Sequence, residues 1–537
     1  MIRKIWAVSA GYRLRILIST LLGLGSVVTS ILFIWASKRV IDIATGDVSG
    51  SFLMASLLTG FLLLLQLGMQ CLNHRLSIRL QAGLSNQLRS RLFKQLMHSS
   101  WNETERFRTG DLMTRIMQDN NEVVRLLAGT IPQIIITATE LFCAFVFLYL
   151  LNAGLALTIL FITPIFLLLS KLYLKRMRFY SRQIKRSDSR INTMLHESFT
   201  HRTVLKTLEY IPLQIQNLND LQTRLMRQTM NRGNLSVFSN AAVSVGFSTG
   251  YLIAFLWGGV QIQSGAISFG TMTAFLQLAS KIQTPALGLI RLLPSLISTW
   301  TASERLMELE TLKKETGEEK HALEGDLTLS LQNVSYGYHS ETPVLRDVTM
   351  EFKAATMTAV MGETGAGKTT LIRLLLGLIL PRQGEITVSN RQKKIGISAG
   401  TRCNFVYVPQ GNTLFATSIR NNLLMGNPNA SQEELHEALH TAAADFVFDL
   451  PNGIYTRLGE QGSGLSEGQA QRIAIARALL RPGGVVILDE ATSALDMETE
   501  ALFLKRLKKR LAGRTVIFIT HHPVLAKSCD MVYRIGN

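Results

Sequence analysis

One stretch near the C-terminal end constrains the fold of this chain more than any other. Residues 485–496 read VVILDEATSALD, which predicts a short buried strand, two carboxylates (Asp489 and Glu490) at its end, and then a tight turn. Well upstream, residues 362–370 read GETGAGKTT and fit the phosphate-binding pattern GxxxxGK[ST]. The flanking apolar residues predict a strand before this loop and a helix after it. The two segments together indicate an α/β domain that binds nucleotide phosphates.

Each residue type in the loop has a physical reason. The three glycines let bare backbone N–H groups approach phosphate oxygens, and the following helix adds the positive end of its dipole. Lys368 supplies a point charge for the β- and γ-phosphates, and the Thr369 hydroxyl is placed to bind Mg²⁺. The predicted ATP-binding residues of the loop are Gly362, Glu363, Thr364, Gly365, Ala366, Gly367, Lys368, Thr369 and Thr370.

A third segment, LSEGQ at residues 465–469, lies between the loop and the acidic pair. The three segments resemble the ATP-binding cassette (ABC) family. In that family the first acid after the strand holds Mg²⁺ and the second polarises the attacking water, so the resemblance gives these roles to Asp489 and Glu490. Glu467 departs from the family's commonest LSGGQ. An acid in the first turn of a helix suits its dipole, so the departure bears on turnover and not on identity.

Shorter segments follow in the family's order. The resemblance implies that Tyr338 of VSYGY stacks on adenine, with Tyr336 as the alternative. It implies that Gln410 of YVPQ contacts Mg²⁺ and the membrane domain, and that His521 of IFITH reaches the γ-phosphate. The neighbouring His522 is interpreted as a bystander, because adjacent histidines lack helical metal-ligand spacing. The predicted catalytic residues are Glu490, His521 and Gln410, and the predicted Mg²⁺ ligands are Thr369, Gln410 and Asp489.

The resemblance also implies a dimer. In this family the signature segment contacts ATP that is bound to a different cassette, and this chain carries one phosphate loop and one signature. A second half-transporter is therefore a required partner, and both a homodimer and a heterodimer are open. The signature residues are Leu465, Ser466, Glu467, Gly468 and Gln469, and the predicted dimer-interface loop is Ser493, Ala494, Leu495 and Asp496.

Clustered apolar residues distinguish the first 300 residues from a soluble ATPase. The chain is 47% apolar, and a span of about 20 residues crosses the hydrocarbon core of a bilayer. The first span lacks an evident cleavage site and is interpreted as a retained helix. The candidate spans are 16–36, 52–72, 131–151, 153–170, 237–260 and 271–296.

Charge distribution predicts the topology. Basic residues precede the first span and follow the second and fourth, whereas the turn at Asn152 and the loop 261–270 carry no charge. The positive-inside rule therefore places both termini and the ATPase domain in the cytoplasm, at the inner membrane if the protein is bacterial. Lys38 and Arg39 would lie on the outer side of the membrane, where the nearby Asp42 and Asp47 offset their charges. The net charge of +18 arises mainly beside the spans, which argues against nucleic-acid binding.

Two long connections predict helical pairs that project into the cytoplasm. Residues 73–130 and 171–236 have helical spacing and little Pro or Gly, so each pair extends about 40–50 Å. Their tips fall near Trp101 and Val204. Residues 107–112 (FRTGDL), followed by Asp119, resemble the first intracellular loop of ABC exporters.

Residues 302–305 (ASER) resemble the exporter pattern that links the last span to the cassette. The predicted domains are a transmembrane domain (1–310), a linker (311–326) and a nucleotide-binding domain (327–537). Charges within spans are costly in lipid and should face protein or water. The three such residues, Glu140, Lys281 and Arg291, indicate either a charged cavity or pairing between helices, and the cavity is otherwise expected to be apolar.

The predicted fold class is a multi-domain membrane protein with a six-helix all-α transmembrane domain of ABC exporter type, followed by an α/β P-loop ATPase domain. The implied function is ATP-driven export of an amphipathic, lipid-, drug- or peptide-like substrate, with ATP and Mg²⁺ as cofactors and alternating access in a dimer embedded in the bilayer. Two alternatives stay open: uptake by the same fold, and a non-transporting ATP-dependent membrane sensor or regulator.

Overall fold

The computed structural model describes residues 10–536, apart from 318, 339–342, 364, 460, 461, 463, 494–496 and 512. Within a few helical segments, chiefly 158–175 and 290–298, only the backbone is described. The chain divides into two compact units. The helical unit comprises Met1–Phe93 and Gly110–Glu308, and the cassette unit comprises Lys94–Thr109 and Leu309–Asn537.

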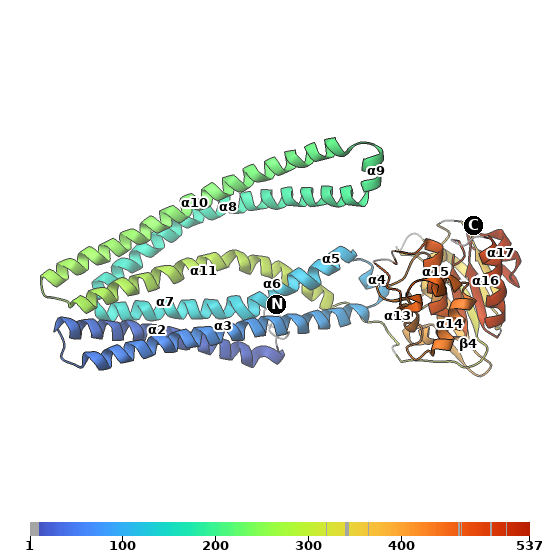
Figure 1. Ribbon diagram of the computed structural model, residues 1–537, viewed down its shortest axis with the longest axis horizontal. Coiled ribbons are helices and arrows are strands. Elements are labelled where there is room, and N and C mark those ends of the chain that lie inside the picture. Colours follow the sequence, from blue (N-terminus) through green and yellow to red (C-terminus); the bar gives the residue numbers. More distant parts are fainter. Residues whose placement is uncertain are drawn as a thin grey trace. The chain divides into compact units, whose positions relative to one another are not determined.

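Long helices form the helical unit (Figure 1). Every span expected from the sequence falls within one of them. Four helical segments of the described part are long and apolar enough to cross a membrane: Arg13–Thr45, Phe52–Met97, Thr109–Leu151 and Ser244–Gln263. The long helices are α2 (Arg13–Thr45), α3 (Phe52–Met97), α7 (Ile131–Leu151), α8 (Ala153–Thr200), α10 (Ile211–Gln263) and α11 (Phe269–Glu310).

The two helical extensions turn at the expected places. A short helix, α4 (Trp101–Thr104), follows α3, and α9 (Arg202–Thr207) joins α8 to α10. Side-chain hydrogen bonds hold α8 against α10, for example from Ser187 Oγ to Gln228 Oε1 at 2.9 Å. The return from α4 to α7 consists of α5 (Thr109–Thr114), a π-helical turn (Arg115–Asp119), α6 (Asn120–Arg125) and a second π-helical turn (Leu126–Thr130).

A charge cluster joins this return segment to the end of α11. Arg115 Nε lies 2.8 Å from Asp111 Oδ2, and its Nη1 lies 2.6 Å from Glu308 Oε2. Arg305 Nη2 lies 2.6 Å from the buried Asp119 Oδ1. In each pair one side chain is buried and its partner is partly exposed, so solvent screens the attraction and the pair stabilises less than a fully buried one would. The two exporter-like patterns, FRTGDL with Asp119 and ASER, are thereby tied together in space.

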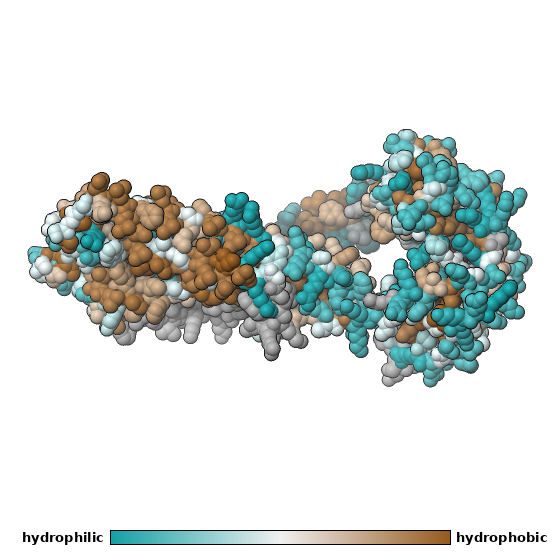
Figure 2. All heavy atoms as spheres, turned by 90° about the horizontal axis from the view of Figure 1, so that it is seen from below, coloured by the Kyte–Doolittle hydropathy of each residue, from teal (hydrophilic) through white to brown (hydrophobic). Residues whose placement is uncertain are grey.

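Apolar residues cover much of the face of the helical unit that Figure 2 shows. On α3, Leu53, Met54 and Leu64 are each at least 70% exposed, as expected of side chains that face lipid. Polar groups at the C-terminal end of α2 and at the start of α11 are instead paired with one another. The buried Asp42 accepts from Lys38 Nζ at 2.8 Å and from the Gly270 N–H at 3.1 Å, which offsets the charge of Lys38.

The cassette unit contains two β-sheets. In the antiparallel sheet the order is β2-β1-β4-β5, and in the parallel sheet it is β6-β7-β8-β3-β9. The strands are β1 (Thr328–Tyr336), β2 (Leu345–Phe352), β3 (Met357–Met361), β4 (Gln383–Ser389), β5 (Lys394–Gly396), β6 (Phe405–Val408), β7 (Val485–Asp489), β8 (Thr515–Ile519) and β9 (Met531–Arg534). The α-helices after residue 310 are α12 (Lys368–Leu375), α13 (Ile419–Leu424), α14 (Gln432–Thr441), α15 (Glu467–Leu479), α16 (Met497–Arg510) and α17 (Pro523–Lys527).

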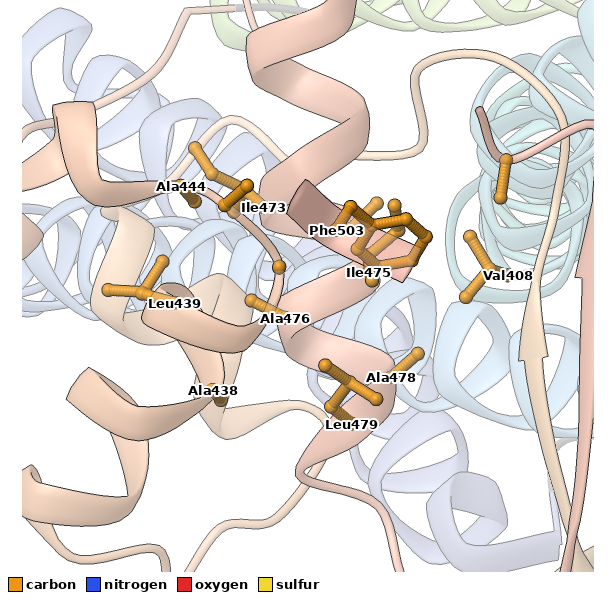
Figure 3. Close-up of a cluster of buried hydrophobic side chains, with 14 of the residues drawn as sticks. Val408, Ala438, Leu439, Ala444, Ile473, Ile475, Ala476, Ala478, Leu479 and Phe503 are labelled. Carbon is orange, nitrogen blue, oxygen red and sulfur yellow. The ribbon is translucent and has the colours of Figure 1, made fainter. Parts of the chain in front are cut away.

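Two hydrophobic cores hold the cassette together. One lies between the two sheets and α12, where Leu371, Leu374 and Leu375 are fully buried. The other gathers α14, α15 and α16 against the parallel sheet (Figure 3). In that core Phe503 of α16 lies among side chains of α15 and Val408 of β6. The cores fix the ends of β3, β7 and β8, from which the candidate site is built.

Residues 94–109 pack with the cassette through backbone hydrogen bonds. The Ser100 N–H donates to Lys313 O and the Glu315 N–H donates to His98 O, both at 2.9 Å. The Gln95 amide donates to Leu312 O, also at 2.9 Å. The tip of the first helical extension is therefore an integral part of the ATPase unit.

We expect Phe503→Ala to lower the apparent Tm of the cassette by about 10 °C, because truncating a fully buried Phe costs about 3–5 kcal/mol. The neighbouring Leu502 is 41% exposed and provides the control, since Leu502→Ala removes little buried surface. Differential scanning calorimetry of the full chain in detergent measures the unfolding temperature of both variants. Equal shifts for the two variants would contradict the packing described here.

Candidate functional site

The phosphate loop runs from β3 into α12, and its backbone conformation requires glycine at two positions. Gly365 and Gly367 have φ of +89° and +93°, a region that residues with a side chain rarely adopt. A Cβ at Gly362 would lie 2.6 Å from Ile535 O, so this glycine is required for close packing. The loop therefore leaves its N–H groups free of side-chain cover at the N-terminus of α12, where anions bind.

Lys368 folds back over this loop. Its Nζ donates to Gly362 O at 2.7 Å and lies 3.9 Å from Glu490 Oε1. Glu363 and Thr369 are exposed, Ala366 is half-buried, and Thr370 is buried beneath them. Thr364 lies outside the described residues. The ammonium group is thus held at the mouth of the loop, between a backbone carbonyl and a carboxylate.

Glu490 directly follows β7 in a strained backbone conformation. Its φ is +46°, and its N–H donates to Ile519 O of β8 at 2.8 Å. The Gln471 amide of α15 donates to Glu490 O at 3.0 Å. Non-glycine residues persist in this region only where the surroundings impose it, and such residues cluster at functional sites. Two neighbouring elements therefore fix the direction of the Glu490 side chain.

The Glu490 carboxylate is the point where the predicted catalytic groups meet. Gln410 Nε2 donates to Oε2 at 2.7 Å, and His521 Nδ1 lies 3.2 Å from Oε1. With Lys368 Nζ 3.9 Å from Oε1, residues from three separate segments converge on one carboxylate. His522 instead donates its backbone N–H to Thr520 Oγ1 at 3.0 Å. A carboxylate held among an amide, an imidazole and an ammonium can orient a water and accept its proton.

Asp489 lies in a drier environment than its neighbour. Burial raises the pKa of its carboxyl to about 6, opposed by the hydrogen bond from Tyr407 and reinforced by the charge of Glu490. The Tyr407 hydroxyl donates to Asp489 Oδ2 at 3.3 Å. A cation bound beside this carboxylate would stabilise its ionised form and offset the effect of burial.

Oxygen donors for a divalent cation are available here. They are the Asp489 carboxylate, the exposed Thr369 hydroxyl and the Gln410 amide oxygen. Among the described residues no cluster of three or more His, Cys, Asp or Glu side chains could hold a metal alone. Mg²⁺ uses one or two carboxylates together with waters and phosphates, so this sparse set of hard donors fits it.

Tyr338 is the tyrosine available for stacking. It is 40% exposed, whereas Tyr336 is 6% exposed, and the two rings meet edge to face at 5.3 Å. Arg373 of α12 donates to the Tyr338 hydroxyl at 2.7 Å. The same guanidinium lies 2.8 Å from Glu105 Oε1 and 5.5 Å from the centroid of the Trp101 ring. Arg373 thus links the phosphate-loop helix, Tyr338 and the segment around α4.

The signature segment forms the start of α15. Ser466 is the N-cap: its Oγ accepts from the Gln469 N–H at 3.2 Å, and its N–H donates to Gln469 Oε1 at 3.0 Å. Glu467 and Gly468 occupy the first turn, and Leu465 packs at the edge of the core. This capping box orients the helix N-terminus, where an acceptor such as phosphate is favoured.

The turn after Glu490 is described only in part. Ser493 is exposed and donates its hydroxyl to Glu490 O at 2.8 Å. The other residues of the predicted interface loop, Ala494, Leu495 and Asp496, lie outside the described part of the chain.

Sequence patterns missed three residues that organise the site. Tyr407 lies within YVPQ, and its clue was that an aromatic side chain three positions before the glutamine could reach the next strand. Gln471 follows the signature by two positions and carried no separate signal. Arg373 lies one turn after Thr369, where a basic residue on the phosphate-loop helix was the available clue.

Comparison with known families agrees with this geometry. A family model of the ABC transporter transmembrane region matches residues 16–286, more than half of the chain, and a model described as ABC transporter matches residues 345–493. The chain therefore belongs to the ABC transporter family. It is an integral membrane protein that binds ATP and couples its hydrolysis to transport across a membrane.

Individual relatives span most of the chain. A putative export ATP-binding/permease protein of Rickettsia prowazekii is 28% identical over 456 residues, covering 83% of this chain and 78% of the relative. An ATP-dependent lipid A-core flippase of Syntrophus aciditrophicus is 26% identical, covering 83% and 74%. An ABC multidrug transporter, mdr2 of Aspergillus fumigatus, is 29% identical, covering 84% and 58%.

The fold also matches a solved structure. A bacterial Atm1-family ABC exporter with ATP bound superposes with a TM-score of 0.81 at 22% identity, covering 98% of this chain and 96% of the other. This likeness confirms the predicted fold class, a transmembrane domain of exporter type fused to an ABC ATPase domain. Half-transporters of this family generally form dimers.

We expect Arg373→Ala to loosen residues 101–105 from the cassette, because it removes the ion pair to Glu105 and the contact with Trp101. Hydrogen–deuterium exchange of the full chain should show faster exchange in residues 98–107 and unchanged protection in β7 and β8. The exposed Arg346 on β2 supplies a control, Arg346→Ala, with the same loss of charge. Unchanged exchange at the tip in Arg373→Ala would refute the link.

Proposed function

We propose that this protein is an ATP-driven exporter that works as a dimer and moves an amphipathic substrate out of the cytoplasm. The observation that carries the proposal is the convergence of Gln410, His521 and Lys368 on the Glu490 carboxylate, at the end of the strand beside the phosphate loop. The exporter-type fold and the export, flippase and multidrug functions in the names of the relatives support the direction.

In this proposal the site residues divide the work by their chemistry. Tyr338 stacks on the adenine, and the loop 362–370 with Lys368 holds the phosphates. Glu490 accepts the proton of the attacking water, while His521 and Gln410 keep its carboxylate in place. Mg²⁺ would be held by Asp489, Thr369 and Gln410 and would supply charge neutralisation at the phosphates.

The proposed partner is a second half-transporter. Ser466, Gly468 and the first turn of α15 would bind the ATP held on the partner's phosphate loop, and the loop 493–496 would lie at the interface of the two cassettes. A homodimer is the simpler arrangement, because this chain carries every catalytic residue type. A heterodimer with a different half-transporter is the alternative, and ATP hydrolysis by the chain alone distinguishes the two.

We further propose the topology and domain limits that the charges indicate. The transmembrane domain is 1–310 with spans at 16–36, 52–72, 131–151, 153–170, 237–260 and 271–296, followed by a linker at 311–326 and the nucleotide-binding domain at 327–537. Both termini and the ATPase would lie in the cytoplasm, at the inner membrane of a bacterial cell. Closure of the cassettes would be transmitted through α4 and α9, and the transport cavity would then open outward.

Uptake and sensing are the competing functions. Transport assays in inverted vesicles separate export from uptake by their direction. A sensor would bind ATP without moving solute, and the assembled catalytic carboxylate counts against it.

We expect Glu490→Gln to abolish ATP hydrolysis by the chain in lipid nanodiscs, by at least a hundredfold, while ATP binding persists. The amide keeps the shape of the side chain but cannot accept a proton, and loss of general-base catalysis typically costs about 10²–10⁴-fold. His521→Ala should also lower the rate, whereas His522→Ala, which removes the adjacent ring, should leave it near wild type.

Hydrolysis that survives Glu490→Gln would disprove the assigned base. A wild-type chain that binds ATP and hydrolyses none by itself would show that the active form is a heterodimer, and co-expression with a second half-transporter would then restore turnover.

A second prediction separates the structural and functional roles of the signature serine. Ser431 caps α14 with the same geometry as Ser466: its Oγ accepts from the Glu434 N–H at 3.2 Å, and its N–H donates to Glu434 Oε2 at 2.8 Å. Removing either cap should cost about 1 kcal/mol of stability. Only Ser466→Ala should also lower ATP turnover, by about tenfold. Equal turnover in Ser466→Ala and Ser431→Ala would refute a nucleotide contact at Ser466.

A further inference from the structure

The helical unit contains a cavity of about 530 Å³ that is separate from the nucleotide site. It lies between α2, α3 and the segment leading into α7, with Lys281 of α11 at its edge. The volume falls in the range of small-molecule sites. The sequence predicted an apolar transport cavity with few charges. The lining of this cavity differs from that expectation, because most of its side chains are polar.

Helix α3 contributes a polar stripe. The residues recur every three or four positions and therefore share one face of the helix. Gln66 and Gln70 lie inside the proposed span 52–72, where amides are costly in hydrocarbon, so this face requires water, protein or a polar ligand against it. The rest of the stripe continues into the helical extension. The lining residues of the stripe are Gln66, Gln70, Asn73, Ser77 and Gln81.

Helix α2 faces this stripe with small residues. Ser19, Gly23, Ser26 and Ser30 also recur every three or four positions and line the cavity. Ser19 Oγ donates to Asn73 Oδ1 at 2.6 Å, and a Cβ at Gly23 would collide with Ile136 of α7. Small side chains bring the helices together at these points and leave the volume between them open.

The third wall departs from regular helix. It includes the π-helical turn Leu126–Thr130, of which Ala128, Gly129 and Thr130 line the cavity. Single π-helical turns occur frequently at functional sites. Arg125 precedes this turn and Gln133 follows it, so the turn sets which side chains reach the cavity from this wall.

The charges of the lining are unequal at its two ends. Glu140 and Lys281 form an ion pair at 2.8 Å, so that end is neutral. Arg125 lies 15 residues before Glu140, or about 22 Å along a helix, and His74 also lines the cavity. Glu140 is the acidic residue of the described lining, and Arg125 has no ion-pair partner among the described residues. The cavity therefore carries an excess of positive charge near Arg125.

We propose that this cavity binds the transported substrate and that the substrate is a polar organic anion. Its acidic group pairs with Arg125, and its other polar groups bond to the amides and hydroxyls of α3. The inference rests on the proposed transport function, and it narrows the substrate class from amphipathic molecules in general. A lipid headgroup and a water-soluble anion share this chemistry.

Two dyes with the same ring system and opposite charge test the class. Carboxyfluorescein is anionic and rhodamine 123 is cationic, and fluorescence anisotropy measures the binding of each to the full chain in phosphatidylcholine nanodiscs. We expect carboxyfluorescein to bind at least tenfold more tightly than rhodamine 123. Arg125→Ala should weaken the binding of carboxyfluorescein at least tenfold, whereas Arg125→Lys should keep most of the affinity for this dye.

Two further variants keep the test independent of folding defects. Gln66→Leu with Gln70→Leu leaves all charges in place and should weaken carboxyfluorescein several-fold. Arg227→Ala removes an exposed charge of α10 that does not line the cavity, and it should change nothing. Equal binding of both dyes, no binding of carboxyfluorescein, or full affinity in Arg125→Ala overturns the proposal.

The lipid composition of the nanodiscs distinguishes a lipid headgroup from a soluble anion as the occupant of the cavity. If a headgroup is the occupant, adding phosphatidylglycerol to the nanodiscs should compete with carboxyfluorescein in the wild type and not in Arg125→Ala. If a soluble anion is the occupant, the lipid should have no effect. Both results support the polar-anion site. ATP hydrolysis measured in the same samples keeps the two proposals apart, because dye binding does not require turnover and loss of turnover does not remove the cavity.

Discussion

Strand β7 is hydrogen-bonded between β6 and β8 in the parallel sheet, and the position of every candidate catalytic group depends on this pairing. Since parallel strands end at the same edge, Gln410 after β6, the acidic pair at the end of β7 and His521 after β8 reach one place. The bond from the Glu490 N–H to Ile519 O extends the pairing one residue beyond the strand, to the residue whose φ is positive. Strand β3, on the other side of β8, delivers the phosphate loop and Lys368 to the same edge.

A second constraint comes from the segment at the tip of the first helical extension. Residues 94–109 are covalently part of the long helical connection, yet their hydrogen bonds and the Arg373 contacts belong to the cassette. Because Arg373 also bonds to Tyr338, a change in how this tyrosine is held would alter the contacts of Glu105 and Trp101. The proposed adenine contact and the proposed transmission element therefore share one guanidinium.

In the membrane part apolar side chains face outward, whereas in the cassette they face the interior. Apolar side chains face outward on α3, where lipid covers them, and the costly polar groups turn toward one another. This explains the pairing of Asp42 with Lys38, of Glu140 with Lys281, and the alignment of amides on one face of α3. Polar residues of α2, α3 and the segment leading into α7 gather around one cavity, and their chemistry is the basis of the proposal that the substrate is a polar anion.

The sequence by itself determined the order of parts and much of their local structure. Apolar runs of about 20 residues predict membrane helices, and the midpoints of the two helical connections place their turns near Trp101 and Val204. GETGAGKTT predicts its own loop, since glycines at 365 and 367 are needed for positive φ. These features are local, so neighbouring residues suffice to predict them. Tertiary structure decided what lies beside what: that Gln410, His521 and Lys368 meet at Glu490, that Arg373 joins Tyr338 to Glu105, and that the polar stripe of α3, the small residues of α2 and the segment leading into α7 enclose one cavity. Such contacts join residues far apart in the chain, and only the packing of whole helices and sheets sets their distances.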